Sequence, residues 1–235
     1  MLILRIVHSF FFYFVLVTSY FIGTSFAMLF VPFIHPTHKI FQTAAHLWAR
    51  FLIPFSGVKV KVSGLENIPK NQPVIFAANH QGAADILLVL AFLPTGFRFA
   101  IKKELFKIPI FGWYLKKAGY FSVDRATILS AYKIVETVVD FIKQGDSVLI
   151  FPEGTRTKTG ELGKFKRGSL LAALKSGAPI VPLAISGSYQ ILKSGSWLFN
   201  PCDIKLSVGQ PIKITSEEDY DKKVEAVREA IAALL

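Results

Sequence analysis

The sequence predicts an α/β domain that follows a hydrophobic membrane anchor. From residue 55 onward, short apolar runs of strand length alternate with longer segments in which apolar residues recur at helical spacing. This alternation is typical of a sheet with helices on its faces. Residues 10–34, in contrast, contain no charged side chain. We therefore expect a two-helix membrane anchor over residues 1–54 and an α/β domain over residues 55–235.

The anchor begins with the uncharged segment. At about 1.5 Å per residue, a helix over residues 10–34 would be roughly 37 Å long, which is enough to cross a bilayer with some tilt. This apolar stretch is too long for a cleaved signal peptide. A second helix is expected over residues 40–52, where apolar residues recur at helical spacing with few charges. Two arrangements stay open: a hairpin that enters one leaflet, or a span followed by an interfacial helix.

The elements of the α/β domain follow from its apolar runs and turn residues. Strands are expected at residues 58–62, 74–78, 97–101, 120–123, 148–151, 180–185 and 204–208. Helices are expected at residues 85–93, 128–143, 168–175 and 217–234. The last of these begins with a capping-box pattern, Thr215-Ser216-Glu217-Glu218.

Charge and composition indicate which classes of partner the chain can bind. The chain is 52% hydrophobic, and 27 Lys and Arg outnumber 16 Asp and Glu, giving a net charge of +11. This balance favours anionic partners such as phospholipid headgroups and phosphorylated substrates. No nucleic-acid-binding module is recognisable, so we expect no nucleic-acid partner. Almost all basic residues follow residue 38, which places the domain on the cytoplasmic face of the cell membrane.

Cysteine and histidine counts exclude several kinds of site. Cys202 is the single cysteine, which rules out an internal disulfide and a thiolate metal cluster. Four of the five histidines precede residue 47, and His80 alone lies in the α/β domain. We therefore expect no metal site and no cofactor in the domain.

A histidine and an aspartate mark the most informative stretch, Asn79-His80-Gln81-Gly82-Ala83-Ala84-Asp85. His80 falls where a strand ends and Asp85 where a helix begins. Gly82 allows the chain to fold back, so the carboxylate can hold one ring nitrogen protonated and leave the other as a base. The alternative is structural: Asp85 caps the helix and His80 is an ordinary strand-end residue.

Two arginine-bearing stretches follow later strands. The first stretch ends a predicted strand with an acid and an arginine, in Tyr120-Phe121-Ser122-Val123-Asp124-Arg125. The second is Phe151-Pro152-Glu153-Gly154-Thr155-Arg156, whose Pro and Gly predict a loop that carries Glu153 and Arg156 outward. Arginine binds phosphate bidentately, so both arginines are candidate phosphate ligands. Structural ion pairs at turns are the alternative. A further apolar strand, 181–186, contains Pro182, which is tolerated at an edge, an end or a bulge.

Taken in order, these stretches resemble the four sequence blocks of the glycerolipid acyltransferases, specifically the 1-acylglycerol-3-phosphate (lysophosphatidic acid) acyltransferases. The blocks are Asn-His-x4-Asp, Gly-Tyr-Phe-x-Val-Asp-Arg, Phe-Pro-Glu-Gly-Thr-Arg and Val-Pro-Leu-Ala-Ile. The resemblance covers roughly residues 55–215, and the N-terminal segment is similar to the family's membrane anchor. It implies a mixed β-sheet flanked by helices.

The resemblance also implies roles for individual residues. His80 would be the general base and Asp85 its orienting partner. The acceptor and its phosphate would be held by Lys102, Lys103, Arg125, Glu153, Gly154, Thr155 and Arg156, with Lys102 favoured over Lys103. Val181 and Pro182 would line the acyl-donor site.

The implied reaction transfers an acyl group from acyl-CoA or acyl-carrier protein to the sn-2 hydroxyl of 1-acyl-glycerol-3-phosphate, forming phosphatidic acid in phospholipid biosynthesis. No G-x-S-x-G elbow in the domain supports a covalent acyl-enzyme, so direct transfer in a ternary complex is expected. Two rival hypotheses remain: another acceptor, such as glycerol-3-phosphate or lyso-ornithine lipid, and a non-catalytic membrane lipid-binding protein. The His80–Asp85 pair disfavours the second. Nothing in the sequence indicates an oligomeric state.

Overall fold

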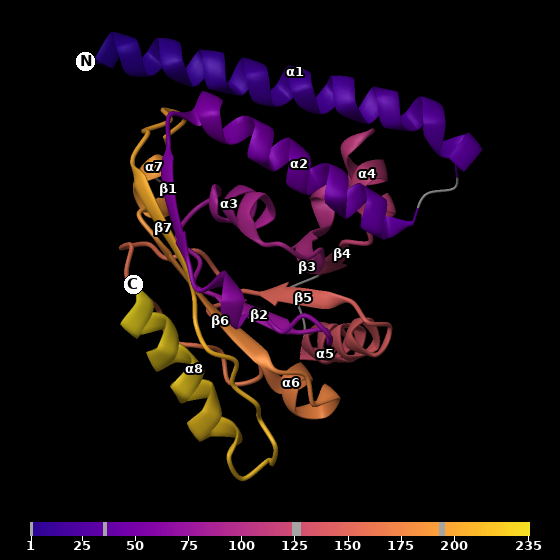
Figure 1. Cartoon of the computed structure of the whole chain (residues 1–235), viewed down its shortest axis with the longest axis vertical. Helices are drawn as coiled ribbons and strands as arrows, with labels where there is room; N and C mark the ends of the chain where they lie inside the picture. Colours follow the sequence, from indigo (N-terminus) through magenta and orange to yellow (C-terminus); the bar gives the residue numbers. More distant parts are fainter. Residues whose placement is uncertain (1, 35–36, 124–127, 193–195) are drawn as a thin grey trace.

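The computed structural model describes residues 2–34, 37–123, 128–192 and 196–235. Within these ranges the chain forms a seven-stranded sheet with helices on both faces. Two long helices, α1 (Leu2–Ile34) and α2 (His38–Ser56), lie along one side of the molecule (Figure 1). The predicted α/β class and the N-terminal apolar helix are confirmed.

The sheet is mixed, with the strand order β1-β7-β6-β2-β5-β3-β4. Only the β6–β7 pair is antiparallel among the paired strands described. β2 lies at the centre between β5 and β6, and all four of its residues are buried, as expected for a strand covered on both faces. The strands are β1 Lys59–Ser63, β2 Ile75–Ala78, β3 Phe97–Lys102, β4 Phe121–Val123, β5 Ser147–Ile150, β6 Ile180–Ser186 and β7 Asp203–Val208.

Helices divide between the two faces of the sheet. With α2, one face carries α3 (Asp85–Phe92) and α4 (Phe111–Lys117), and the other carries α5 (Ile128–Lys143), α6 (Leu171–Ser176) and α8 (Tyr220–Leu234) (Figure 1). Each face has its own apolar core. Three short elements complete the fold: η1 Leu65–Asn67, η2 Lys103–Lys107 and α7 Ser188–Ile191.

The structure differs from the predicted elements in a few places. α4 and α7 were not predicted, because both are too short to show a helical period. α6 begins at Leu171 instead of residue 168. α8 begins at Tyr220 instead of residue 217, so the predicted capping box is wrong. Ser216 Oγ instead accepts the Asp219 N–H at 3.3 Å in a turn before the helix.

α1 lies against α2 and the domain. Trp48 Nε1 of α2 donates to Ser19 Oγ at 3.0 Å, and the Phe199 N–H donates to Ser9 Oγ at 2.9 Å. Away from these contacts the side chains of α1 are apolar and exposed; Ile3 is 76% exposed and Ile22 is 71% exposed. Of the helices in the described ranges, α1 alone is long and apolar enough to cross a membrane, over Leu2–Val31.

α2 is docked into the domain by polar contacts as well as by its apolar side. His38 Nε2 lies 3.0 Å from Asp146 Oδ1, and Arg98 Nη2 donates to Asp146 Oδ2 at 2.6 Å. Gln42 Nε2 donates to the Ala118 carbonyl at 3.0 Å. α2 therefore helps build the core on its face of the sheet. The division of the chain into 1–54 and 55–235 stays a prediction.

Candidate active site

The turn between β2 and α3 brings His80 and Asp85 together. His80 Nδ1 lies 2.7 Å from Asp85 Oδ2, and the same oxygen accepts the N–H groups of Gln81 at 2.7 Å and Gly82 at 2.8 Å. Asp85 is fully buried. Its carboxylate therefore holds the turn before α3 and contacts the imidazole. It does not cap α3, whose N-cap position is Ala84, so the helix-cap alternative is not what the structure shows.

The His80 ring is held so that its second nitrogen stays available. Its plane stacks on Phe151, with ring centroids 4.0 Å apart and an interplanar angle of 19°. An Nδ1–H donated to the Asp85 carboxylate leaves a lone pair on Nε2. Within the described residues Nε2 makes no hydrogen bond, and His80 lines the large cavity described below. The arrangement provides a base aimed at a ligand.

Glu153 does not point outward as the sequence suggested. Its side chain is buried, Oε1 accepts the His80 N–H at 2.8 Å, and Oε2 accepts the Gly163 N–H at 2.8 Å. Both carboxylate oxygens are thus engaged by backbone. The expectation failed because Pro152 and Gly154 turn the chain without exposing the residue between them. Glu153 fixes His80 relative to the loop over residues 151–163.

Three cationic side chains line the same cavity as His80: Lys102, Arg156 and Lys166. Arg156 is exposed and forms no ion pair with the described residues. The Lys102 side chain is 74% exposed and lies 3.8 Å from Glu104. Since exposed ion pairs of this kind contribute little, Lys102 is available to an anionic ligand.

Lys166 was not predicted from the sequence. Its side chain lies over Gly154, where an added Cβ would lie 2.5 Å from Lys166 Cε. Gly154 also has φ +76°, a conformation that favours glycine. The one signal in the sequence was Gly154 itself. A glycine can mark a position where another group packs close to the backbone, but it does not identify that group as Lys166.

The remaining predicted site residues fall in different places. Lys103 and Thr155 are exposed, and neither is among the residues lining the cavity in the described part of the chain. Arg125 lies outside the described residues. Val181 and Pro182 are buried in β6 at the centre of the sheet, away from the cavity wall. They therefore do not line this cavity, and their place at the acyl-donor site stays a prediction.

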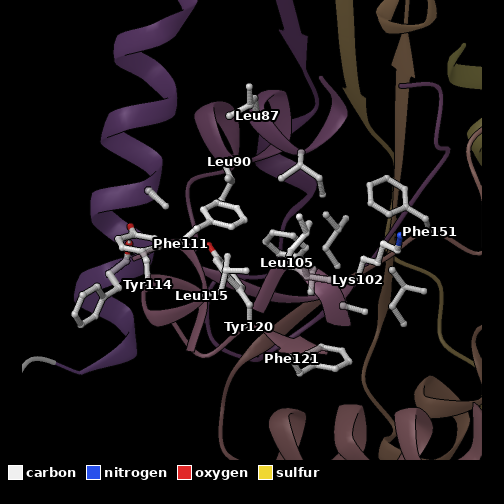
Figure 2. A pocket seen from close by; sticks show the side chains of 18 of the residues that line it. Leu87, Leu90, Lys102, Leu105, Phe111, Tyr114, Leu115, Tyr120, Phe121 and Phe151 are labelled. Atoms are coloured by element: carbon white, nitrogen blue, oxygen red, sulfur yellow. Dashed lines mark hydrogen bonds between the residues drawn. The ribbon is translucent and has the colours of Figure 1, made fainter. Parts of the chain in front are cut away.

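The cavity has a volume of about 1180 Å³ and mainly apolar walls. It extends from His80 to α1, α2 and α4, where Tyr20, Gly23, Phe41 and Tyr114 contribute to its wall. Figure 2 shows Lys102 and Phe151 at one side and Phe111 and Tyr114 at the other, beside a helix of the anchor. Burial raises the pKa of Tyr114, which stays a neutral phenol at physiological pH. A long hydrocarbon chain suits this space.

Comparisons with known proteins agree with this geometry. Residues 59–186 match the family model described as Acyltransferase. The chain is 36% identical, over 81% of its length, to a chloroplastic 1-acyl-sn-glycerol-3-phosphate acyltransferase of Arabidopsis thaliana, and it covers 53% of that protein. It is 30% identical to a 1-acyl-sn-glycerol-3-phosphate acyltransferase of Pseudomonas aeruginosa, with 88% of this chain and 80% of that protein covered.

A solved structure is also similar. The crystal structure of the 1-acyl-sn-glycerophosphate (LPA) acyltransferase PlsC from Thermotoga maritima matches with a TM-score of 0.83 and 30% identity. The match covers 99% of this chain and 96% of that one, so it includes the two N-terminal helices. The chain spans little more than half the length of two chloroplastic plant relatives, 53% of the Arabidopsis thaliana protein and 57% of one from Brassica napus.

Proposed function

The chain belongs to the acyltransferase family, and from that premise we propose that it acylates the sn-2 hydroxyl of 1-acyl-glycerol-3-phosphate to form phosphatidic acid. One observation carries the proposal: His80, bonded to a buried carboxylate, lines an apolar cavity whose wall also bears three cations. A lipid with a free hydroxyl and a phosphate matches all three features. This reaction would serve phospholipid biosynthesis.

In the proposed reaction His80 acts as general base. Nε2 removes the proton from the acceptor hydroxyl as its oxygen forms a bond with the thioester carbonyl carbon. The C–S bond then breaks, and the thiolate that leaves takes the proton back from the imidazolium, so a free thiol is released and His80 is neutral again. Asp85 stabilises the imidazolium between these steps, in the manner of an orienting carboxylate. The chemistry needs no metal, because a thiolate is a good leaving group.

The acceptor is recognised by charge and by length. Arg156, Lys166 and Lys102 line the cavity and are the proposed partners of the phosphate, and a guanidinium offers two parallel donors to its oxygens. The apolar cavity accommodates acyl chain. A purified enzyme offered a panel of acceptors should prefer lysophosphatidic acid. A preference for glycerol-3-phosphate would show that the proposed acceptor is wrong. A preference for a phosphate-free lipid such as lyso-ornithine lipid would refute the proposed role of the cations in binding phosphate.

The donor is an acyl thioester of CoA or of acyl-carrier protein. Both carriers are anionic, and besides the two cations assigned to the acceptor the loop after β5 exposes Lys158, Lys164 and Arg167. The loop is fixed to the site, since the Thr157 N–H donates to the His80 carbonyl at 2.8 Å. Charge complementarity thus supports an anionic donor without choosing between the two. Assays with both donors at matched chain length make that choice.

The protein is proposed to act at the cytoplasmic face of the cell membrane, with α1 and α2 as a hairpin in one leaflet. The exposed apolar side of α1 supports membrane association. Its Ser9 and Phe12 contact Phe199 and its Ser19 contacts Trp48 of α2, and these contacts keep the helix along the domain. A single perpendicular span would have to break those contacts. Labelling of single cysteines introduced at Ile3 and Ile22, with membrane-impermeant reagent on each side of intact vesicles, distinguishes the two arrangements.

The first test is thioester consumption by detergent-solubilised protein given long-chain acyl-CoA, with and without lysophosphatidic acid. We expect thiol release that depends on the acceptor, with phosphatidic acid as product, and its loss in His80→Ala. Absence of transfer with either donor and every acceptor would refute the enzyme and favour a non-catalytic lipid-binding protein.

A further inference from the structure

The Asp85 carboxylate has a fourth partner that comes from a distant part of the chain. While Oδ2 receives the His80, Gln81 and Gly82 donors, Oδ1 accepts the Ser188 hydroxyl at 2.5 Å. Ser188 is 1% exposed and lies 103 residues after Asp85. Its hydroxyl oxygen also lies 3.3 Å from Gln81 Oε1, but its single proton favours the shorter contact to a charged acceptor.

The fold delivers Ser188 to this position. β6 ends at Ser186, Gly187 turns the chain with φ +92°, and Ser188 begins α7. A Cβ on Gly187 would lie 2.5 Å from the Asp203 carbonyl oxygen, so the turn requires glycine. On the other side, a Cβ on Gly82 would lie 3.0 Å from the Ser188 carbonyl oxygen. The two glycines therefore fix the backbone that carries the hydroxyl: Gly187 turns the chain next to Asp203, and Gly82 packs against the Ser188 carbonyl.

We propose that Ser188 is a positioning residue for catalysis, which fixes Asp85 and limits the negative charge that Asp85 presents to His80. The inference rests on the proposed roles of His80 and Asp85. A carboxylate bonded through one oxygen alone can rotate out of the imidazole plane, whereas donors on both oxygens prevent this rotation. A donor on Oδ1 also draws charge away from Oδ2 and so weakens the stabilisation of the imidazolium.

Loss of the hydroxyl has two separable consequences. Asp85 becomes less well oriented, which lowers kcat. Its carboxylate also becomes more negative towards His80, so protonated His80 is favoured and the acidic limb of the rate–pH profile moves to higher pH.

Other ionisable groups near the pair stay in place when Ser188 is changed. They are Glu153 on the His80 backbone, Lys102, Arg156 and Lys166 on the cavity wall, Lys158 and Glu161 in the adjoining loop, and Tyr189, whose hydroxyl donates to the Lys158 carbonyl.

The test compares Ser188→Ala and Ser188→Cys with the wild-type enzyme across pH. Alanine removes the side-chain group, whereas cysteine retains a slightly larger group of the same shape that is only a weak donor, so the pair separates an unfilled space from a lost hydrogen bond. We expect kcat to fall about tenfold in both variants, as for the loss of a hydrogen bond to a charged group. The acceptor KM should change less than about twofold, and the acidic limb should move to higher pH in both.

Ser207→Ala is the matched control, because Ser207 is also 1% exposed and its hydroxyl contacts Ser63 Oγ at 3.4 Å, in the β1–β7 pair away from the site. We expect its kcat and pH profile to match the wild type. Full activity in Ser188→Cys, or an unmoved acidic limb in both variants, would overturn the inference while leaving the proposed function intact. If the wild type itself shows no His80-dependent transfer, the proposed function fails and the inference fails with it.

Discussion

The two halves of the candidate site are built in opposite ways. On the proton-transfer side, the Asp85 and Glu153 carboxylates are buried and all four of their oxygens accept hydrogen bonds. On the cationic side, Arg156 and Lys166 are exposed, and no ion pair within the described residues engages them. Under the proposed mechanism, the geometry is fixed by the protein where the proton would move, and is left to the ligand where the phosphate would bind.

The largest expected effect comes from removing the base. His80→Ala should lower kcat about 10²–10⁴-fold, because general base catalysis typically contributes that much. The unfolding temperature should fall by a few degrees at most, since the buried Asp85 carboxylate keeps its donors from Gln81, Gly82 and Ser188. Acyl transfer and thermal unfolding measured on the same preparation test this, and unchanged activity would remove His80 from the mechanism.

Glu153 tests whether the buried half also depends on its backbone partners. In Glu153→Gln one amide N–H₂ must face a backbone N–H, of either His80 or Gly163, which leaves a buried donor unpaired at a cost of about 1–3 kcal/mol. We expect kcat to fall about 10-fold to 100-fold and the unfolding temperature to drop. The control is Glu225→Gln at an exposed position of α8, which should change neither kcat nor the unfolding temperature. Wild-type kcat in Glu153→Gln would show that His80 needs no such support.

Arg156 tests the exposed half. Arg156→Ala should raise the KM for lysophosphatidic acid about tenfold while raising the donor KM far less, because a charge-assisted contact with the phosphate is lost. Steady-state kinetics with each substrate varied in turn provides the comparison. Lys222→Ala, an exposed cation on α8, serves as the control for net charge. Equal rises in both KM values would indicate that Arg156 has a structural role.

The smallest effect on catalysis is expected at a buried ionic cluster remote from the cavity. Burial of Asp146 opposes its ionisation, but hydrogen bonds from His38 and Arg98 outweigh burial, so the pKa of Asp146 lies below its ordinary value. A lowered folded-state pKa means that its stabilisation is fully present above the unfolded-state pKa, about 3.9, and is lost as the pH falls through the folded-state value.

Unfolding temperatures measured across this acidic range test the cluster. The wild type should lose stability as the pH falls through the acidic range, and Asp146→Asn should be less stable at pH 7 with a flatter pH dependence. Its kcat at pH 7 should stay near that of the wild type. An identical acid dependence in both proteins would show that the cluster does not contribute through ionisation.

Much of the fold was predictable because its signals are local. The buried strands read as continuous apolar runs, and the His80–Asp85 contact needed a spacing of five residues and a glycine. Ser188 and Lys166 were missed because they reach the site through tertiary contacts. Ser188 lies 103 residues from its partner, and nothing in its own neighbourhood signals a carboxylate.

The same limit applies to the strand that contains Val181 and Pro182. Its apolar pattern is equally consistent with a core and with a ligand wall, and β6 places both residues in the core. Pro182 is the third residue of β6 and pairs with Ala77 of β2. It precedes Leu183, where pairing with β7 begins, so it stands inside the strand but before the second ladder starts. Burial was predictable here, but its consequence for binding was not.

The position of α1 has a consequence for how the protein can be studied. Leu16, Tyr20, Gly23 and Phe30 of this helix belong to the wall of the cavity that also contains His80. Deleting the helix to obtain a more soluble fragment would therefore remove one wall of this cavity. The apolar helix and the proposed active site share that wall, so shortening the chain at its N-terminus would alter both.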